Sequence, residues 1–133
     1  MRFHETRLRV RYAETDKMGI VYHANYLIWM EVGRVEYFRA AGLRYRDLEA
    51  DSDVHLAVVE ATCRYAAPAL YDDEVIVKTS MELANRRMVI FEYEIRNAES
   101  EQILATGRTK HLVLGRDLKP CKMPERYRPI FGL

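Results

Sequence analysis

The chain has 133 residues, of which 49% are hydrophobic and 31% are charged, and these values fit one globular domain spanning residues 1–133. Its 21 Lys and Arg residues nearly balance its 20 Asp and Glu residues, so the net charge of +1 gives no global field that would attract nucleic acid or an anionic membrane surface. No stretch approaches the roughly 20 apolar residues of a membrane span, so we expect neither a nucleic-acid nor a membrane partner.

The first predicted elements are a strand over residues 3–12 and a loop over residues 13–22. Residues 3–12 alternate apolar and charged side chains, which is typical of a half-buried strand. The side expected to be apolar carries Leu8, Val10 and Tyr12. Residues 13–22 break this alternation, and Gly19 suits a tight bend near the middle of a loop.

The longest helical pattern runs from about residue 23 to residue 41. It contains no proline, and its apolar residues cover most of the helical circumference. Such a helix must be nearly wrapped by other structure. Gly42 lies where a left-handed carboxyl-terminal cap is expected. Residues 43–55 are charged and irregular, and they predict a surface loop.

Four further strands are predicted after this loop, over residues 56–66, 74–83, 89–96 and 103–114. Short connections between them favour antiparallel pairing, and one sheet can bury a helix by curling round it. We therefore predict an α+β fold in which a curled antiparallel five-stranded sheet wraps a long central helix. The tail from about residue 116 is rich in proline and is expected to be irregular.

Cysteine usage and the first residues bear on metal binding and on location. Cys63 and Cys121 are far apart and lack CxxC spacing, so neither a zinc module nor a disulfide framework is expected. The first residues show no hydrophobic signal region. We expect an unexported, cytoplasmic protein without a metal.

Several enzyme classes lack their motifs in this chain. We find no GxSxG, GxGxxG, GxxxxGK[ST] or HExxH pattern, and the three serines have no nearby histidine that would mark a catalytic triad. The absence of these motifs does not exclude catalysis by a carboxylate.

The most informative segment runs from Tyr12 to Tyr26 and contains Asp16, Gly19, His23 and Asn25. These residues lie ahead of the long helix, where unpaired backbone N–H groups and the helix dipole favour negative charge, such as a developing oxyanion. The alternative is structural: Asp16 caps a turn, Gly19 permits a positive φ, and His23 or Asn25 caps the helix.

This segment, Asp16-x-x-Gly19-x-Val21-Tyr22-His23-x-Asn25-Tyr26, resembles the signature of the 4-hydroxybenzoyl-CoA thioesterase family of hot-dog fold acyl-CoA thioesterases. The helix continuation Arg34-x-Glu36-x-Phe38 and the downstream Tyr65-x-x-Pro68-Ala69-x-x-Asp72-Asp73 are also similar to that family. The resemblance covers about residues 4–115. It implies the hot-dog fold and hydrolysis of a thioester to a free acid and CoA, without a metal or redox cofactor.

The resemblance also implies roles for individual residues. Asp16 matches the catalytic carboxylate of the family, acting as general base or as nucleophile, and the backbone N–H at or near His23 matches the group that polarises the thioester carbonyl. The His23 side chain either orients water or substrate or caps the helix. The expected substrate-binding residues of this segment are Gly19, Val21, Tyr22 and Asn25, with structural capping as the alternative for Asn25.

The phosphates of CoA need a basic site, and the best candidates are Arg86 and Arg87 in the turn between the third and fourth predicted strands. A solvated hairpin turn explains these residues equally well. The resemblance implies homodimers or homotetramers in which sheets pair edge to edge and the sites form at subunit interfaces. Two alternatives stay open: a thioesterase for acyl groups on acyl carrier protein, and a non-catalytic acyl-CoA binding module.

Overall fold

The structure, a computed structural model, describes residues 3–52 and 54–133. Its strands are β1 (Phe3–Arg9), β2 (His55–Tyr65), β3 (Glu74–Ala84), β4 (Met88–Asn97) and β5 (Ile103–Leu114). Its α-helices are α1 (Asn25–Ala40) and α2 (Tyr45–Ser52), and two 3₁₀ segments are η1 (Tyr12–Glu14) and η2 (Glu125–Phe131).

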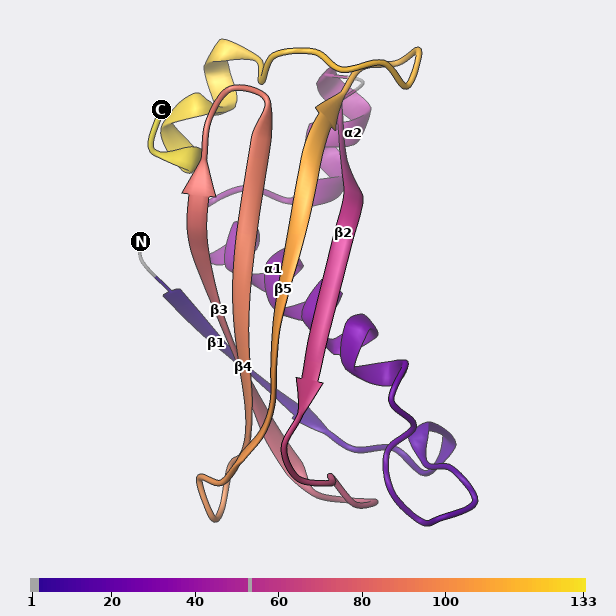
Figure 1. Cartoon of the computed structure of the whole chain (residues 1–133). Coiled ribbons are helices and arrows are strands. Elements are labelled where there is room, and N and C mark those ends of the chain that lie inside the picture. The colour runs from indigo at the N-terminus through magenta and orange to yellow at the C-terminus, as the bar shows by residue number, and fades with distance from the viewer. Residues whose placement is uncertain (1–2, 53) are drawn as a thin grey trace.

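The five strands form one antiparallel sheet in the order β1-β3-β4-β5-β2, and α1 runs diagonally across one face of it (Figure 1). The core lies between α1 and this inner face, where Met30, Phe38 and Phe91 are almost completely buried. The predicted α+β class and the helix covered by a curled sheet are confirmed. Strands β1 and β2 are the two edges of the sheet.

Two glycines allow α1 to approach the sheet closely. A Cβ on Gly33 would lie 2.5 Å from Thr79 Oγ1 and 2.8 Å from a methyl carbon of Val77. A Cβ on Gly107 of β5 would collide with the side chain of Met30 and lie 2.9 Å from the Thr62 carbonyl oxygen. The helix backbone at Gly33 therefore packs directly on side chains of β3, and the Met30 side chain of α1 packs directly on the backbone of β5 at Gly107.

Replacing Gly107 by Ala is expected to destabilise the fold, because the added methyl group must displace Met30 or the β2 backbone. Overpacking of this kind costs about 1–3 kcal/mol, and the melting temperature should fall by about 3 °C or more. Gly115→Ala is the matched control, since the nearest atom to its Cβ would lie at 3.5 Å, an ordinary contact. Equal melting temperatures for the two variants would contradict the close approach of helix and sheet.

The predicted loop over residues 43–55 was wrong, because most of it folds as α2. Leu43 and Leu48 are buried, and the hydroxyl of Tyr45 accepts a hydrogen bond of 3.0 Å from the backbone N–H of Leu56. Half of the residues of this short helix are charged, so few apolar positions revealed its periodicity. Gly42 has a φ of +94°, as its predicted place after α1 requires.

Two smaller expectations also need correction. The tail is not wholly irregular: η2 packs onto the core through Phe131, and Met123 just before it is completely buried. Tyr12 does not lie on the apolar side of β1. The strand ends at Arg9, and the Tyr12 side chain is 77% exposed because the chain has already turned into η1.

Apolar side chains of α1 and of the edge strand β2 stay exposed in the single chain. Leu27 and Ile28 of α1 and Val58 and Val59 of β2 each expose 40% or more of their surface. The register between β2 and β5 shifts between Val58 and Glu60, so β2 carries a bulge at Val59.

Among the described residues, no helix is both long and apolar enough to cross a membrane.

Candidate active site

Asp16 lies in a small hairpin between β1 and α1, which we call the Asp16 hairpin (residues 15–21). Thr15 and Val21 form an antiparallel bridge at its base. The Asp16 backbone N–H donates to the Ile20 carbonyl at 2.8 Å, and the Gly19 N–H donates to the Asp16 carbonyl at 3.0 Å. Gly19 has a φ of +82°, which explains why a glycine closes this turn.

The carboxylate of Asp16 is half-buried, and one of its oxygens is already used. Oδ1 accepts a hydrogen bond of 2.8 Å from the backbone N–H of Met18, which fixes the orientation of the side chain. Within residues 3–52 and 54–133, the second oxygen accepts no hydrogen bond. An oriented carboxylate with one free oxygen can take a proton from water or attack a carbonyl carbon.

The amino-terminal end of α1 offers two free backbone donors. The N–H groups of Tyr22 and Asn25 are bonded to the carbonyls of Glu14 and Tyr22, both at 2.9 Å. By contrast, among the described residues the amides of His23 and Ala24 donate no backbone hydrogen bond. Unpaired amides at the positive end of a helix dipole favour an oxyanion.

Tyr65, at the end of β2, fixes this helix start from the sheet side. Its hydroxyl donates a hydrogen bond of 2.9 Å to the carbonyl oxygen of His23. Partial burial of the hydroxyl and its contact with Cys63 raise the pKa of Tyr65 to about 12, so the hydroxyl keeps the proton that it donates. The Tyr65 ring also packs edge-on against Tyr26, with ring centroids 5.1 Å apart.

Asp16 and His23 line the same hollow of about 350 Å³, together with Val21, Tyr26 and Tyr65. The hollow is therefore bounded by a carboxylate, by the start of α1 and by an apolar and aromatic wall. This composition suits an acyl group whose reacting end is polar.

The other predicted residues of this segment have mainly structural contacts in the single chain. Tyr22 is 48% exposed and packs on the His23 ring, with centroids 4.4 Å apart. Asn25 does not cap α1, whose N-cap is Ala24, but its side-chain amide donates to the Glu14 carbonyl at 2.8 Å. This bond ties α1 to the base of the Asp16 hairpin.

Arg86 and Arg87 lie far from Asp16 within one chain. Their turn between β3 and β4 is at the top of Figure 1, whereas the loop before α1 is at the lower right, beside the end of β2. Asn85 closes the turn by accepting hydrogen bonds of 2.9 Å from the N–H groups of Arg87 and Met88. Both arginines are exposed and line a shallow surface hollow with Lys122.

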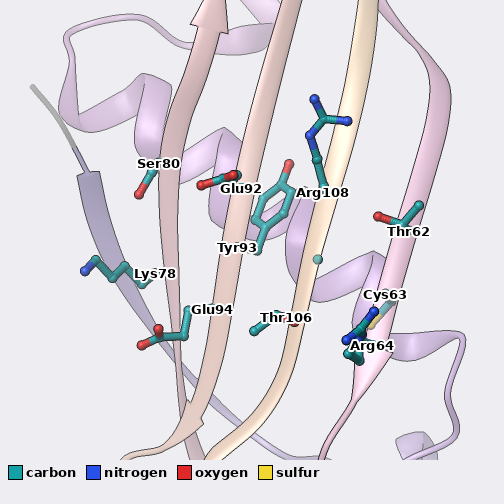
Figure 2. Close-up of a pocket in the computed structure, with 11 residues that line it drawn as sticks. Thr62, Cys63, Arg64, Lys78, Ser80, Glu92, Tyr93, Glu94, Thr106 and Arg108 are labelled. Atoms are coloured by element: carbon teal, nitrogen blue, oxygen red, sulfur yellow. The ribbon is translucent and has the colours of Figure 1, made fainter.

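A larger hollow, of about 760 Å³, lies on the outer face of the sheet, away from α1 (Figure 2). Arg108 of this hollow is paired with glutamates of neighbouring strands, at 2.7 Å from Glu82 and 3.8 Å from Glu60. Lys78, Glu94 and Thr106 occupy neighbouring positions on β3, β4 and β5. All the residues that line this larger hollow belong to strands, so it has no helix amides that could bind an oxyanion. We therefore place the candidate active site at the smaller hollow around Asp16.

Sequence reasoning missed three residues around Asp16, namely Glu14, Tyr26 and Tyr65, as participants in the site. Each acts through a partner that only the fold brings close, such as Tyr65 with His23. No cluster of three or more His, Cys, Asp or Glu side chains that could hold a metal occurs in the described part of the chain.

Known proteins share the sequence pattern and the fold of this chain. Residues 10–130 match the sequence pattern of the Thioesterase-like superfamily. YneP of Bacillus subtilis, provisionally named an acyl-CoA thioesterase, is 38% identical over 98% of this chain and 87% of its own length. The structure of a DHNA-CoA thioesterase from Staphylococcus aureus superposes with a TM-score of 0.89 at 36% identity, covering 97% of this chain and 85% of that one. The fold also matches 4-hydroxybenzoyl CoA thioesterase from Pseudomonas sp. strain CBS-3, with a TM-score of 0.88 at 19% identity over 98% of this chain and 99% of that one.

Proposed function

This chain belongs to the thioesterase-like superfamily and has its hot-dog fold, so it is a thioester hydrolase acting on acyl-CoA, and we propose that Asp16 and the start of α1 perform the hydrolysis. One observation carries the proposal. Asp16, whose carboxylate keeps a free oxygen, and His23, whose backbone amide is unbonded and directly precedes the unbonded amide of Ala24, line one hollow.

The chemistry follows from the placement of these groups. The thioester carbonyl oxygen binds at the amides of His23 and Ala24, which stabilise the negative charge that develops on it; losing one such donor typically costs about 10²–10³ in rate. A water oxygen attacks the carbonyl carbon while Asp16 takes its proton. The C–S bond then breaks, and the CoA thiolate leaves and is protonated. All the required groups belong to the chain, so this route needs neither a metal nor a redox cofactor.

A second route uses Asp16 as the nucleophile. Its free oxygen attacks the carbonyl carbon, CoA leaves as the thiolate, and water hydrolyses the mixed anhydride. A single turnover in oxygen-18 water with enzyme in excess tests the two routes. Unlabelled acid arises only when water attacks the Asp16 carboxyl carbon of the anhydride, so that an Asp16 oxygen enters the product and the label stays in the protein. Labelled acid is expected both from the general-base route and from water attack on the acyl carbon of the anhydride, so unlabelled acid is the result that identifies Asp16 as the nucleophile.

We assign the recognition of the CoA phosphates to Arg86 and Arg87. Their distance from Asp16 within one chain means that they would serve the site of another subunit. In the competing assignment, this turn docks an acidic acyl carrier protein.

The unpaired thiols Cys63 and Cys121 are consistent with the reducing cytoplasm as the location.

Replacing both arginines by Ala is expected to raise KM for acyl-CoA about tenfold with kcat nearly unchanged, because contacts to the phosphates are the same in the ground and transition states. A thioester of N-acetylcysteamine, which lacks the phosphates, should be hydrolysed by the variant as by the wild type. Equal losses on both substrates would mean that the turn only supports the structure. A loss confined to acyl carrier protein substrates would favour the competing assignment.

A further inference from the structure

Glu14 is a buried carboxylate two residues before Asp16, and only 6% of it is exposed. It accepts hydrogen bonds of 2.8 Å from the indole Nε1–H of Trp29 and of 2.8 Å from the backbone N–H of Arg11. The Arg11 guanidinium lies 3.4 Å from the same oxygen that Trp29 contacts. Its oxygens are therefore occupied, and Glu14 does not line the hollow around Asp16.

The backbone carbonyl of Glu14 makes two further connections. It accepts a hydrogen bond of 2.9 Å from the N–H of Tyr22 and one of 2.8 Å from the side-chain amide of Asn25. Glu14 thus contacts Arg11, which lies two residues after β1, the residue that follows the Asp16 hairpin and two residues of α1.

The far side of the Asp16 hairpin has a separate attachment. Ile20 bridges to Leu70, and the Val21 N–H donates to the Ala69 carbonyl at 2.9 Å. These contacts hold the hairpin against the turn after β2 but do not join it to α1. Besides the chain itself between Val21 and His23, the contacts that join the start of this hairpin to α1 run through Glu14.

We propose that Glu14 is a positioning residue, whose buried carboxylate, held by Trp29, fixes the Asp16 carboxylate at its working distance from the helix amides. This inference rests on the proposed function, in which Asp16 and these amides act on the same carbonyl group. Displacing a reacting group by about 1 Å can cost about 10²-fold in rate. A residue that holds the Asp16 carboxylate in place therefore affects kcat.

The ionisation of Glu14 is consistent with this role. Burial alone would raise its pKa, but the hydrogen bonds from Arg11 and Trp29 outweigh burial and hold the pKa of Glu14 below its usual value. The carboxylate is therefore charged at neutral pH, and its bonds to the two donors are charge-assisted and strong.

The test compares Glu14→Gln, Trp29→Phe and the double variant with the wild type. Glu14→Gln keeps an oxygen that accepts from Trp29, but it turns an N–H₂ group toward the Arg11 N–H donor. Trp29→Phe keeps the aromatic packing and removes the indole N–H donor. We expect each single variant to lower kcat by about 10- to 100-fold with KM changed less than threefold, because binding contacts are retained. The double variant should lose less than the product of the two single losses, since both changes weaken the same anchor.

Thr109→Val is the matched control, because it removes buried hydrogen bonds of 2.6 and 2.8 Å to Tyr93 and His111 in the core. It should lower the melting temperature and leave kcat unchanged. Amide hydrogen exchange gives a second readout: the N–H groups of Met18 and Gly19 should exchange at least tenfold faster in the Glu14 and Trp29 variants, while those of β4 stay protected.

Two results would overturn the inference: a lower melting temperature with kcat within twofold of the wild type, as for Thr109→Val, or a rise in KM with kcat unchanged. If Glu14→Gln does not fold, Trp29→Phe carries the same test. An active Asp16→Asn enzyme would instead refute the proposed function. An inactive Asp16→Asn with fully active Glu14 and Trp29 variants would refute only the role of Glu14.

Discussion

Replacing Asp16 by Asn is expected to lower kcat for acyl-CoA by at least about 10³ and to leave the fold intact. The two side chains have nearly the same shape, and the amide oxygen of Asn can still accept the hydrogen bond from the Met18 N–H. The variant loses the negative charge, and with it both the general base and the nucleophile. A loss of this size therefore reports on the chemistry and not on the hairpin.

The measurement is single-turnover hydrolysis of acyl-CoA, with the melting temperature as a check on folding. Asp73→Asn is the matched control, because the Asp73 carboxylate also accepts a backbone hydrogen bond within a turn, of 2.9 Å from Leu70, but does not line the hollow around Asp16. The control should keep kcat within about twofold of the wild type. A folded Asp16→Asn enzyme that retains more than a tenth of the activity removes Asp16 from the mechanism.

The sequence predicts those residues of the site that lie close to one another along the chain. Asp16, Gly19 and His23 lie within eight consecutive positions, so the hairpin and the helix start could be inferred from local patterns. The positive φ of Gly19 follows from the tight turn that the hairpin requires. The strands were predictable for a similar reason, because alternation along one strand is a local property.

What could not be predicted depends on partners distant in sequence. Tyr65 reaches the His23 carbonyl from β2, and that contact exists only after the sheet has curled over α1. Glu14 looks like an ordinary surface acid in the sequence, and its burial depends on the Trp29 indole that closes over it. Helix α2 was missed because half of its residues are charged, whereas burial of Leu48 in the core stabilises it.

The oligomeric state is the second result with a large expected effect. The edge strand β2 and one side of α1 leave Ile28 and Val59 each 51% exposed, and an unpaired, apolar sheet edge favours association with a second copy. We expect light scattering to give a mass at least twice 15.7 kDa. The double variant Ile28→Glu, Val59→Glu puts charges on this surface, and it should dissociate and lose kcat/KM for acyl-CoA by about tenfold or more.

The loss of activity on dissociation follows from the geometry of one chain. The hollow around Asp16 and the exposed arginines of the β3–β4 turn lie at opposite ends of the sheet, so one subunit cannot apply both to the same substrate (Figure 1). Leu118→Glu is the control, since Leu118 is 68% exposed in the tail, outside β2 and α1, and should change neither mass nor activity. A wild-type monomer of 15.7 kDa at micromolar concentration, or a dissociated variant with full activity, would show that each subunit holds a complete site.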